Sequence, residues 1–193
     1  MIGRRMRQLP HAGEVLCFYA RILPDKIGAR DLDRAMTFRE WNARACRLAN
    51  ALLGLGLAKG DRVAVLAYNC IEWLEIYAAT AKAGLIAVPV NFRLVGEEIR
   101  YIVENCEAVA FIVQDDLLEP VGQVRGDLPV PPSNFIHFGA TTCPLGYHAY
   151  EDLLGAARDD EPDVKVWPAD PWTLCRRVSF RSTGCSAASA PPG

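Results

Sequence analysis

Short apolar runs alternate with longer segments of helical periodicity through the middle of the chain. The runs at 62–67, 85–90 and 108–113 are rich in Val, Ile, Leu and Ala and are bounded by turn residues, which indicates buried strands. Between them, 71–82 and 96–106 carry apolar side chains at helical spacing. Alternation of this kind favours parallel strands joined by crossover helices. The chain is therefore predicted to adopt an α/β fold, with a largely parallel sheet flanked by helices.

Further elements are expected on both sides of this region. Thr37 and Glu40 form a capping-box pattern at the start of a helix that ends at Gly56. Asn69 is expected to cap the next helix, and Gly84 to end it. The remaining predicted elements are a helix at 14–23, a hairpin of 27–30 with 35–38, short helices at 115–121 and 150–157, and a strand at 135–138.

The composition is that of an ordinary globular protein, with 193 residues of which 51% are hydrophobic and 23% charged. A chain of this length can form one domain with a substantial core. The formal charge of −2 offers no basic surface for nucleic acid or an anionic membrane. No apolar stretch approaches the roughly 20 residues of a spanning helix, and no secretory signal precedes residue 14. The chain is therefore expected to have no membrane span and to be cytoplasmic.

The residue types that carry catalysis are scattered along the chain. The seven cysteines form no Cys-x-x-Cys pair, and several fall at apolar positions, so no metal site is expected. The first serine is Ser133 and the three histidines are far apart, which argues against a serine nucleophile and a catalytic triad. His137 is interpreted as a packed or surface residue. No catalytic residue is assigned.

Two other groups of side chains are interpreted as structural. Adjacent acids turn their side chains apart on a helix or strand, so the pairs at 97–98, 115–116 and 159–160 are expected to be solvated. Trp41 and Trp73 lie at helical spacing among apolar residues, which favours core packing over a ligand cage.

Five segments, in order along the chain, resemble one family of enzymes. They are TFREWNAR at 37–44, GDRVAVL at 60–66, NCIEW at 69–73, AGLIAVPVNFRL at 83–94 and EIRYI at 98–102. Together they make the chain similar to the adenylate-forming ligases, in the long-chain or medium-chain acyl-CoA synthetase branch. The resemblance implies the first subdomain of the ligase large domain. It also implies a reaction in which ATP activates a carboxylic acid to an acyl-adenylate, which then passes to CoA. ATP, Mg and CoA are thus the cofactors implied for the complete enzyme.

The family's phosphate-binding loop is missing after Leu174. In the family, a strand like the one that ends there leads into a glycine-rich loop with hydroxyls and a lysine, groups that a phosphate requires. Residues 175–193 contain Ser182-Thr183-Gly184 but no lysine and no acid. A disordered tail is expected there, and the fragment is expected to bind no cofactor and to be inactive alone. A lost reading frame near codon 175 and a divergent in-frame terminus both remain open.

One segment keeps a functional interpretation. Asn91, Phe92 and Arg93 follow the predicted strand at 85–90, and ligands of open α/β sheets bind beyond the carboxyl ends of strands. The resemblance implies that this loop lies beside the channel for the CoA thiol, with Phe92 against the CoA and Arg93 near its phosphates. The alternative is a structural turn in which Arg93 pairs with a carboxylate such as Glu97.

The chain is expected to divide into four parts. These are a frayed N-terminus at 1–13, a partial ligase N-terminal subdomain at 14–157, a linker at 158–174 and an aberrant tail at 175–193. Three functions remain open: an inert product, half of a ligase completed by another chain, or a module that binds CoA or a protein. Truncation would expose an apolar face and a sheet edge, so self-association is expected.

Overall fold

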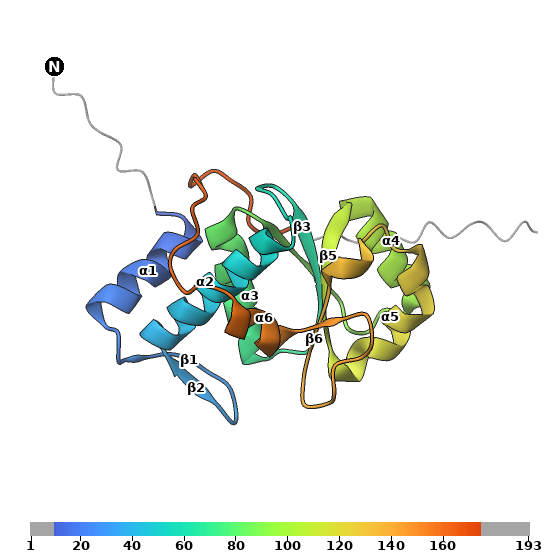
Figure 1. Ribbon diagram of the computed structural model, residues 1–193, viewed down its shortest axis with the longest axis horizontal. Helices are drawn as coiled ribbons and strands as arrows, with labels where there is room; N and C mark the ends of the chain where they lie inside the picture. Colours follow the sequence, from blue (N-terminus) through green and yellow to red (C-terminus); the bar gives the residue numbers. More distant parts are fainter. Residues whose placement is uncertain (1–9, 175–193) are drawn as a thin grey trace, which may run out of the picture.

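The computed structural model describes residues 10–174, and a parallel five-stranded sheet forms the centre of the molecule (Figure 1). The strand order is β4-β3-β5-β6-β7, and every neighbouring pair is parallel. The strands are β3 (Arg62–Leu66), β4 (Ile86–Val90), β5 (Ala108–Gln114), β6 (Phe135–Phe138) and β7 (His148–Ala149). The predicted α/β fold is confirmed. The expectations for residues 1–9 and for the tail at 175–193 lie outside the described residues.

Helices cover both faces of the sheet, because successive strand residues point to opposite sides. The covering helices are α2 (Phe38–Gly54), α3 (Ile71–Ala83), α4 (Gly96–Cys106), α5 (Leu118–Val124) and α6 (Tyr150–Ala156). Val63 and Val65 of β3 pack with α2, α3 and α6, whereas Ala64 and Leu66 pack with α4 and α5. Figure 1 shows these two layers on either side of the strands. Burial on both faces explains why β3 is a continuous apolar run.

The part of the chain before α2 forms a helix and a hairpin. The helix is α1 (Ala12–Ile22), which packs on α2 and α3, and the hairpin joins β1 (Ile27–Arg30) to β2 (Ala35–Thr37). At the start of α2, Thr37 Oγ1 accepts from the Glu40 amide at 3.2 Å, and the Glu40 carboxylate accepts from the Thr37 amide at 2.8 Å. The predicted first helix, hairpin and capping box are therefore confirmed.

The start of α3 differs from the prediction. Cys70, not Asn69, occupies the cap position, and no side chain caps the helix. Asn69 lies one residue too early to serve the amides of the first turn. Gly84 ends α3 as predicted, with a φ of +66° that glycine adopts without strain.

Two short elements also differ from the prediction, and neither has a clear periodic pattern in the sequence. The predicted helix at 115–121 is a 3₁₀ turn (Asp115–Leu117) followed by α5. The strand β7 was not predicted from the sequence, and it has only two residues and pairs with β6 alone. A pair of residues is too short to show an alternating pattern.

Residues 158–174, called the strap below, lie along α2 and α3 without forming a helix. The Asn50 side chain of α2 donates to two strap carbonyls, both at 2.9 Å. Lys82 Nζ of α3 lies 2.8 and 2.6 Å from the two carboxylate oxygens of Glu161 in the strap. The Lys82 side chain is only 2% exposed. Hydrogen bonds and an ion pair thus hold the strap against α2 and α3.

The end of the strap adds to the sheet. Lys59 pairs with Asp170 at 2.6 Å, close to the point where the strap reaches β4. The Ala87 amide of β4 then donates to the Trp172 carbonyl at 3.0 Å, and the Leu174 amide donates to the Ala87 carbonyl at 2.9 Å. The strap thus pairs with the edge strand β4 at the single position Ala87.

Candidate functional site

A cleft of about 750 Å³ opens at the carboxyl ends of β3 and β4. β3 lies between β4 and β5 in the sheet, and the cleft lies on the β4 side of β3. Ligands of open α/β sheets bind beyond the carboxyl ends of strands, which is where this cleft opens. The walls come from the β1–β2 hairpin, the loop after β3, α3 and the end of β4, and they include Ala67, Cys70, Trp73, Tyr77, Asn91 and Phe92.

The loop after β4 contributes two of its three predicted residues to the cleft. Asn91 and Phe92 line it, and Asn91 Oδ1 accepts from the Arg93 amide at 3.0 Å. The Arg93 guanidinium carbon lies 5.6 Å from the centre of the Phe92 ring. Glu97, the suggested partner of Arg93, pairs instead with Arg100 at 2.6 Å. No ion pair of residues 10–174 involves Arg93, so the predicted pairing with Glu97 is wrong.

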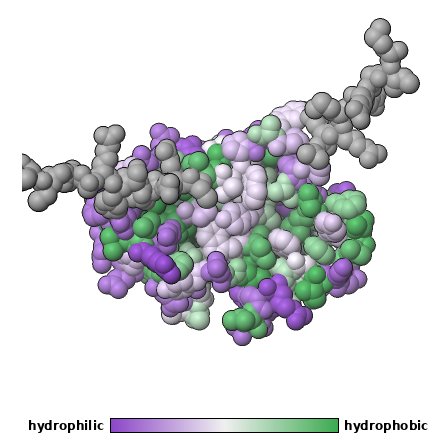
Figure 2. Space-filling model, turned by 180° about the vertical axis from the view of Figure 1, so that it is seen from behind, coloured by the Kyte–Doolittle hydropathy of each residue, from purple (hydrophilic) through white to green (hydrophobic). Residues whose placement is uncertain are grey.

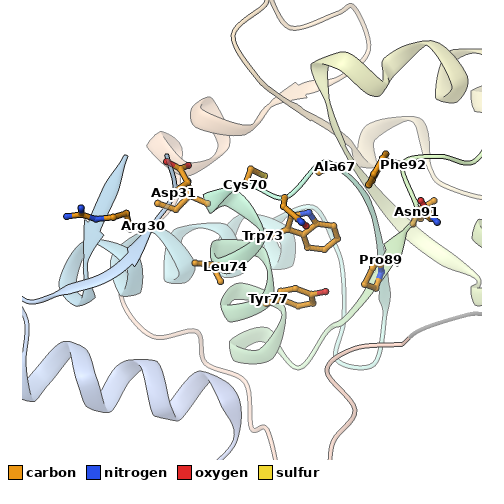
Figure 3. Close-up of a pocket in the computed structure, with 13 residues that line it drawn as sticks. Arg30, Asp31, Ala67, Cys70, Trp73, Leu74, Tyr77, Pro89, Asn91 and Phe92 are labelled. Atoms are coloured by element: carbon orange, nitrogen blue, oxygen red, sulfur yellow. The ribbon is translucent and has the colours of Figure 1, made fainter. Parts of the chain in front are cut away.

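Trp73 and Tyr77 form an aromatic wall of the cleft. Their ring centres are 5.1 Å apart, and Tyr77 meets the ring of Trp172 from the strap edge-on at 5.7 Å. Figure 3 shows both α3 rings projecting toward Pro89 of β4. Trp41 and Trp73 pack against core clusters as predicted, but Trp73 also lines the cleft. Helical spacing alone could not reveal this role, because α3 is apolar on most of its sides.

The cleft offers groups for binding rather than for covalent catalysis. Burial, and then the Glu72 carboxylate, raise the pKa of Cys70 to about 12. A thiol that stays protonated at neutral pH is a poor nucleophile. The Arg34 backbone amide, which donates to Asp31 at 2.7 Å, lowers the pKa of the Asp31 carboxyl. Aromatic rings, an amide side chain and a nearby guanidinium suit a ligand that is partly apolar and partly anionic.

Neither a metal site nor a membrane-spanning helix is found within residues 10–174. Between residues 10 and 174, no group of three or more His, Cys, Asp or Glu side chains is arranged to hold a metal ion. The helices of the same part lack the combined length and hydrophobicity that crossing a membrane requires.

A second polar cluster lies at the carboxyl ends of β5 and β6, beside a cavity of about 670 Å³. The buried His137 contacts the Asp115 carboxylate, which also accepts from the Thr141 amide at 2.8 Å and from its hydroxyl at 2.6 Å. Burial raises the pKa of Asp115, but the hydrogen bonds outweigh it and the pKa is lowered. The prediction of a solvated acid is wrong for Asp115, because the loop after β6 folds over it. It is confirmed for Asp159 and Asp160, which are exposed.

Comparison with known sequences gives a family match. The family described as AMP-binding enzyme matches residues 19–175. A medium-chain-fatty-acid–CoA ligase of Ectopseudomonas oleovorans is 31% identical over 180 residues, which cover 87% of this chain and 32% of that protein. A long-chain-fatty-acid–CoA ligase of Thermus thermophilus is 37% identical over 123 residues, which cover 64% and 22%. The chain thus spans a third or less of these relatives.

Solved structures agree with the sequence comparison. An anthranilate CoA ligase in complex with anthranoyl-AMP superposes with a TM-score of 0.80 at 28% identity, covering 86% of this chain and 32% of the other. A Mycobacterium tuberculosis fatty acyl CoA synthetase gives 0.73 at 29% identity, with the same coverage. These similarities confirm the resemblance and the fold that were predicted from the sequence.

Proposed function

Because the chain belongs to the family of AMP-binding enzymes, we propose that it supplies the amino-terminal subdomain of an ATP-dependent acyl-CoA ligase. The relatives above are named as CoA ligases for fatty acids and for anthranilate. The proposed substrate is therefore a carboxylic acid, and more narrowly a fatty acid. In the parent reaction the carboxylate attacks the α-phosphate of ATP and releases pyrophosphate. The CoA thiol then attacks the acyl-adenylate and releases AMP.

The observation that carries a role for the described residues is the position of Asn91 and Phe92 on the wall of the cleft. Phe92 and Trp73 offer apolar surface to the pantetheine chain of CoA. Arg93 lies against the Phe92 ring, and no ion pair within residues 10–174 neutralises it. Its guanidinium is available to a phosphate, for which arginine offers several donors in a planar fork. We therefore favour the CoA-channel interpretation of this loop over a purely structural turn.

We propose that these 193 residues alone cannot activate a carboxylic acid with ATP. Stabilising the charge of a transferring phosphoryl group requires positioned donors and a cation. Residues 175–193 contain Ser182-Thr183-Gly184 but no lysine. We infer that this chain alone forms no acyl-adenylate and retains at most the CoA contact. ATP–pyrophosphate exchange with a fatty acid measures this directly, and exchange by the purified chain would overturn the inference.

Calorimetric titration with CoA tests the binding role. A dissociation constant on the order of 0.1–1 mM is expected for a loop site of this size. Phe92→Ala should weaken the binding of both CoA and phosphate-free pantetheine. Arg93→Ala should weaken the binding of CoA about tenfold and leave the binding of pantetheine unchanged. Arg100→Ala is the matched control, because Arg100 lies on α4 and pairs with Glu97 and Glu104. Absence of heat at millimolar CoA would remove the CoA-binding role.

A second candidate function is half of a split ligase. It is favoured by the relatives' length, since about two thirds of each lies outside the match. A separate polypeptide comprising that remaining part of a relative would be mixed with this chain, and acyl-adenylate formation would be measured. Activity in the mixture, but in neither component, is expected for a split enzyme. If the mixture and the CoA titration are both negative, an inert product is the remaining interpretation.

We also infer a cytoplasmic location for the chain. ATP and CoA, the proposed cofactors of the parent enzyme, are cytoplasmic metabolites, and the five cysteines within residues 10–174 are all unbridged. Free thiols of this kind are usual in a reducing compartment. Cell fractionation with an antibody against the chain tests the location, and recovery with the secreted fraction would contradict it.

A further inference from the structure

α1 carries a row of apolar side chains that the rest of the molecule leaves partly exposed. Val15, Phe18, Tyr19 and Ile22 are spaced at i, i+3, i+4 and i+7, so they share one helical face. They are 39%, 56%, 39% and 51% exposed, respectively. The opposite face carries Leu16, which packs on the core. α1 is thus apolar on two sides. One is buried, and the other is only partly covered, because Tyr19 stacks on Phe38 of α2 at 5.2 Å between ring centres.

The exposed row continues into neighbouring apolar surface. Leu23 and Ile27 are 39% and 46% exposed, and a groove of about 340 Å³ between α1, α2 and α3 is lined by Val15, Tyr19 and Trp41 among others. Figure 2 shows hydrophobic residues exposed at the end of the molecule that α1 forms. A connected apolar surface of this kind on a soluble protein usually marks an interaction site.

Two charged residues flank the row, one at each end of it. Glu14 lies in the first turn of α1 and Arg21 in the last. They are seven residues apart, which is about two turns or roughly 10 Å along the axis, and they project from the same flank of the row. The Glu14 side chain is 58% exposed; its carboxylate lies 3.8 Å from His11 Nε2 and accepts from the His11 amide at 3.3 Å. Arg21 is exposed, and none of the ion pairs of residues 10–174 involves it.

We propose that α1 is the contact surface of a dimer of this chain, in which two copies of α1 pack antiparallel about a twofold axis. A symmetric contact must be complementary to itself. A twofold axis near Phe18 places the two apolar rows face to face and brings Glu14 of each copy beside Arg21 of the other. In a parallel twofold pair the charged flanks of the two copies would lie on opposite sides of the contact, so these charges would form no pairs across it. The charge pattern therefore selects a second copy, in the antiparallel orientation, as the occupant of this surface.

The dimer is expected to be weak. A helix of 11 residues is about 16 Å long, so the contact is small beside the roughly 1,200–2,000 Å² of stable interfaces. A dissociation constant in the micromolar range or above is expected. The two charge pairs set orientation and register more than affinity. The α1 surface would account for the self-association expected from the sequence, independently of the proposed chemistry.

Charge reversal tests the orientation. Glu14→Lys and Arg21→Glu should each weaken the dimer about tenfold, measured by sedimentation across a concentration series, because each creates two like-charge contacts. An equimolar mixture of the two variants should regain the affinity of the unaltered chain, since every reversed charge then meets its opposite. Loss of the Glu14 capping box alone cannot produce such a rescue. A dimer that neither reversal weakens, or a mixture without rescue, overturns the antiparallel pairing.

Removal of the central side chain tests the surface itself. Phe18→Asp acts in both copies and should weaken the dimer at least about a hundredfold, with an unchanged circular dichroism spectrum because Phe18 is largely exposed. Leu145→Asp is the matched control, at a site that is 98% exposed and far from α1 in the sequence. A chain that stays monomeric at every concentration, or one that binds phosphatidylcholine vesicles without forming dimers, overturns the proposal. Phe18 does not line the cleft, so the CoA titration is read independently of this result.

Discussion

Replacing Glu161 by Gln is expected to destabilise the protein more than replacing Lys82 by Met, although both changes break the same ion pair. The Lys82 side chain is 2% exposed and that of Glu161 is 41% exposed. Glu161→Gln leaves a buried ammonium group facing a single neutral acceptor. Lys82→Met leaves a carboxylate that can turn toward water, and it fills the buried space with an apolar chain of similar length.

The exposures set the expected magnitudes. Breaking a buried pair by removing one partner costs about 3–5 kcal/mol, whereas an exposed pair contributes about 0–1 kcal/mol. Because water reaches Glu161, Glu161→Gln should lower the free energy of unfolding by about 2–3 kcal/mol, below the fully buried range. Lys82→Met should cost about 1 kcal/mol or less. Domains of this size have about 5–15 kcal/mol of stability in total, so the difference is measurable.

Urea unfolding followed by circular dichroism measures both values. Hydrogen exchange at the Leu174 amide, which donates to the Ala87 carbonyl, reports the strap separately. Glu161→Gln should speed this exchange more than exchange in β3 or β5. Asp159→Asn is the control, because it breaks an exposed strap pair with Arg47 and should change stability by less than about 0.5 kcal/mol. A Lys82→Met variant at least as destabilised as Glu161→Gln would refute the burial argument.

The same pair predicts a dependence on pH. Burial raises the pKa of Glu161, but Lys82 outweighs it and holds the pKa below its ordinary value of 4.5. A carboxyl whose pKa is lowered by folding contributes stability that is present above the unfolded pKa and is lost as the pH falls through the folded pKa. The difference in stability between the unaltered chain and Glu161→Gln should therefore shrink as the pH falls below about 4.5. A difference that is constant from neutral pH into this range would contradict the assignment.

Three further predictions concern local contacts. Thr37→Ala removes the acceptor that caps α2 and should lower the free energy of unfolding by about 1 kcal/mol in urea; an unchanged value would exclude a stabilising cap. Gly139→Ala should cost about 2–4 kcal/mol, because φ is +146° and the added Cβ would collide with the Asp115 carboxylate, whereas Gly122→Ala, with open space around the new Cβ, should show no such loss. Burial raises the pKa of Asp115 and the Thr141 hydrogen bonds outweigh it, so its stabilisation is lost as the pH falls below the ordinary value of 3.8; Thr141→Val should move acid unfolding to higher pH, and an unmoved midpoint would contradict the contact.

The sequence by itself determined most of the secondary structure. The apolar run of β3, the capping box at Thr37 and the terminal Gly84 of α3 act through neighbours within a few residues, so they can be read without a fold. Asn91 and Phe92 were located by the rule that ligands bind beyond strand ends, and the cleft lies there.

The tertiary structure alone decided what surrounds these elements. Lys82 and Glu161 are 79 residues apart, and Asp115 and His137 are 22 apart. No local pattern links such pairs; sheet register and helix packing bring them together, and burial then sets the strength of their interaction. Tertiary packing likewise gives Trp73 its second role, as a wall of the cleft, and leaves one face of α1 only partly covered. Helical spacing shows that a side is apolar, but only packing determines whether protein or solvent lies against it.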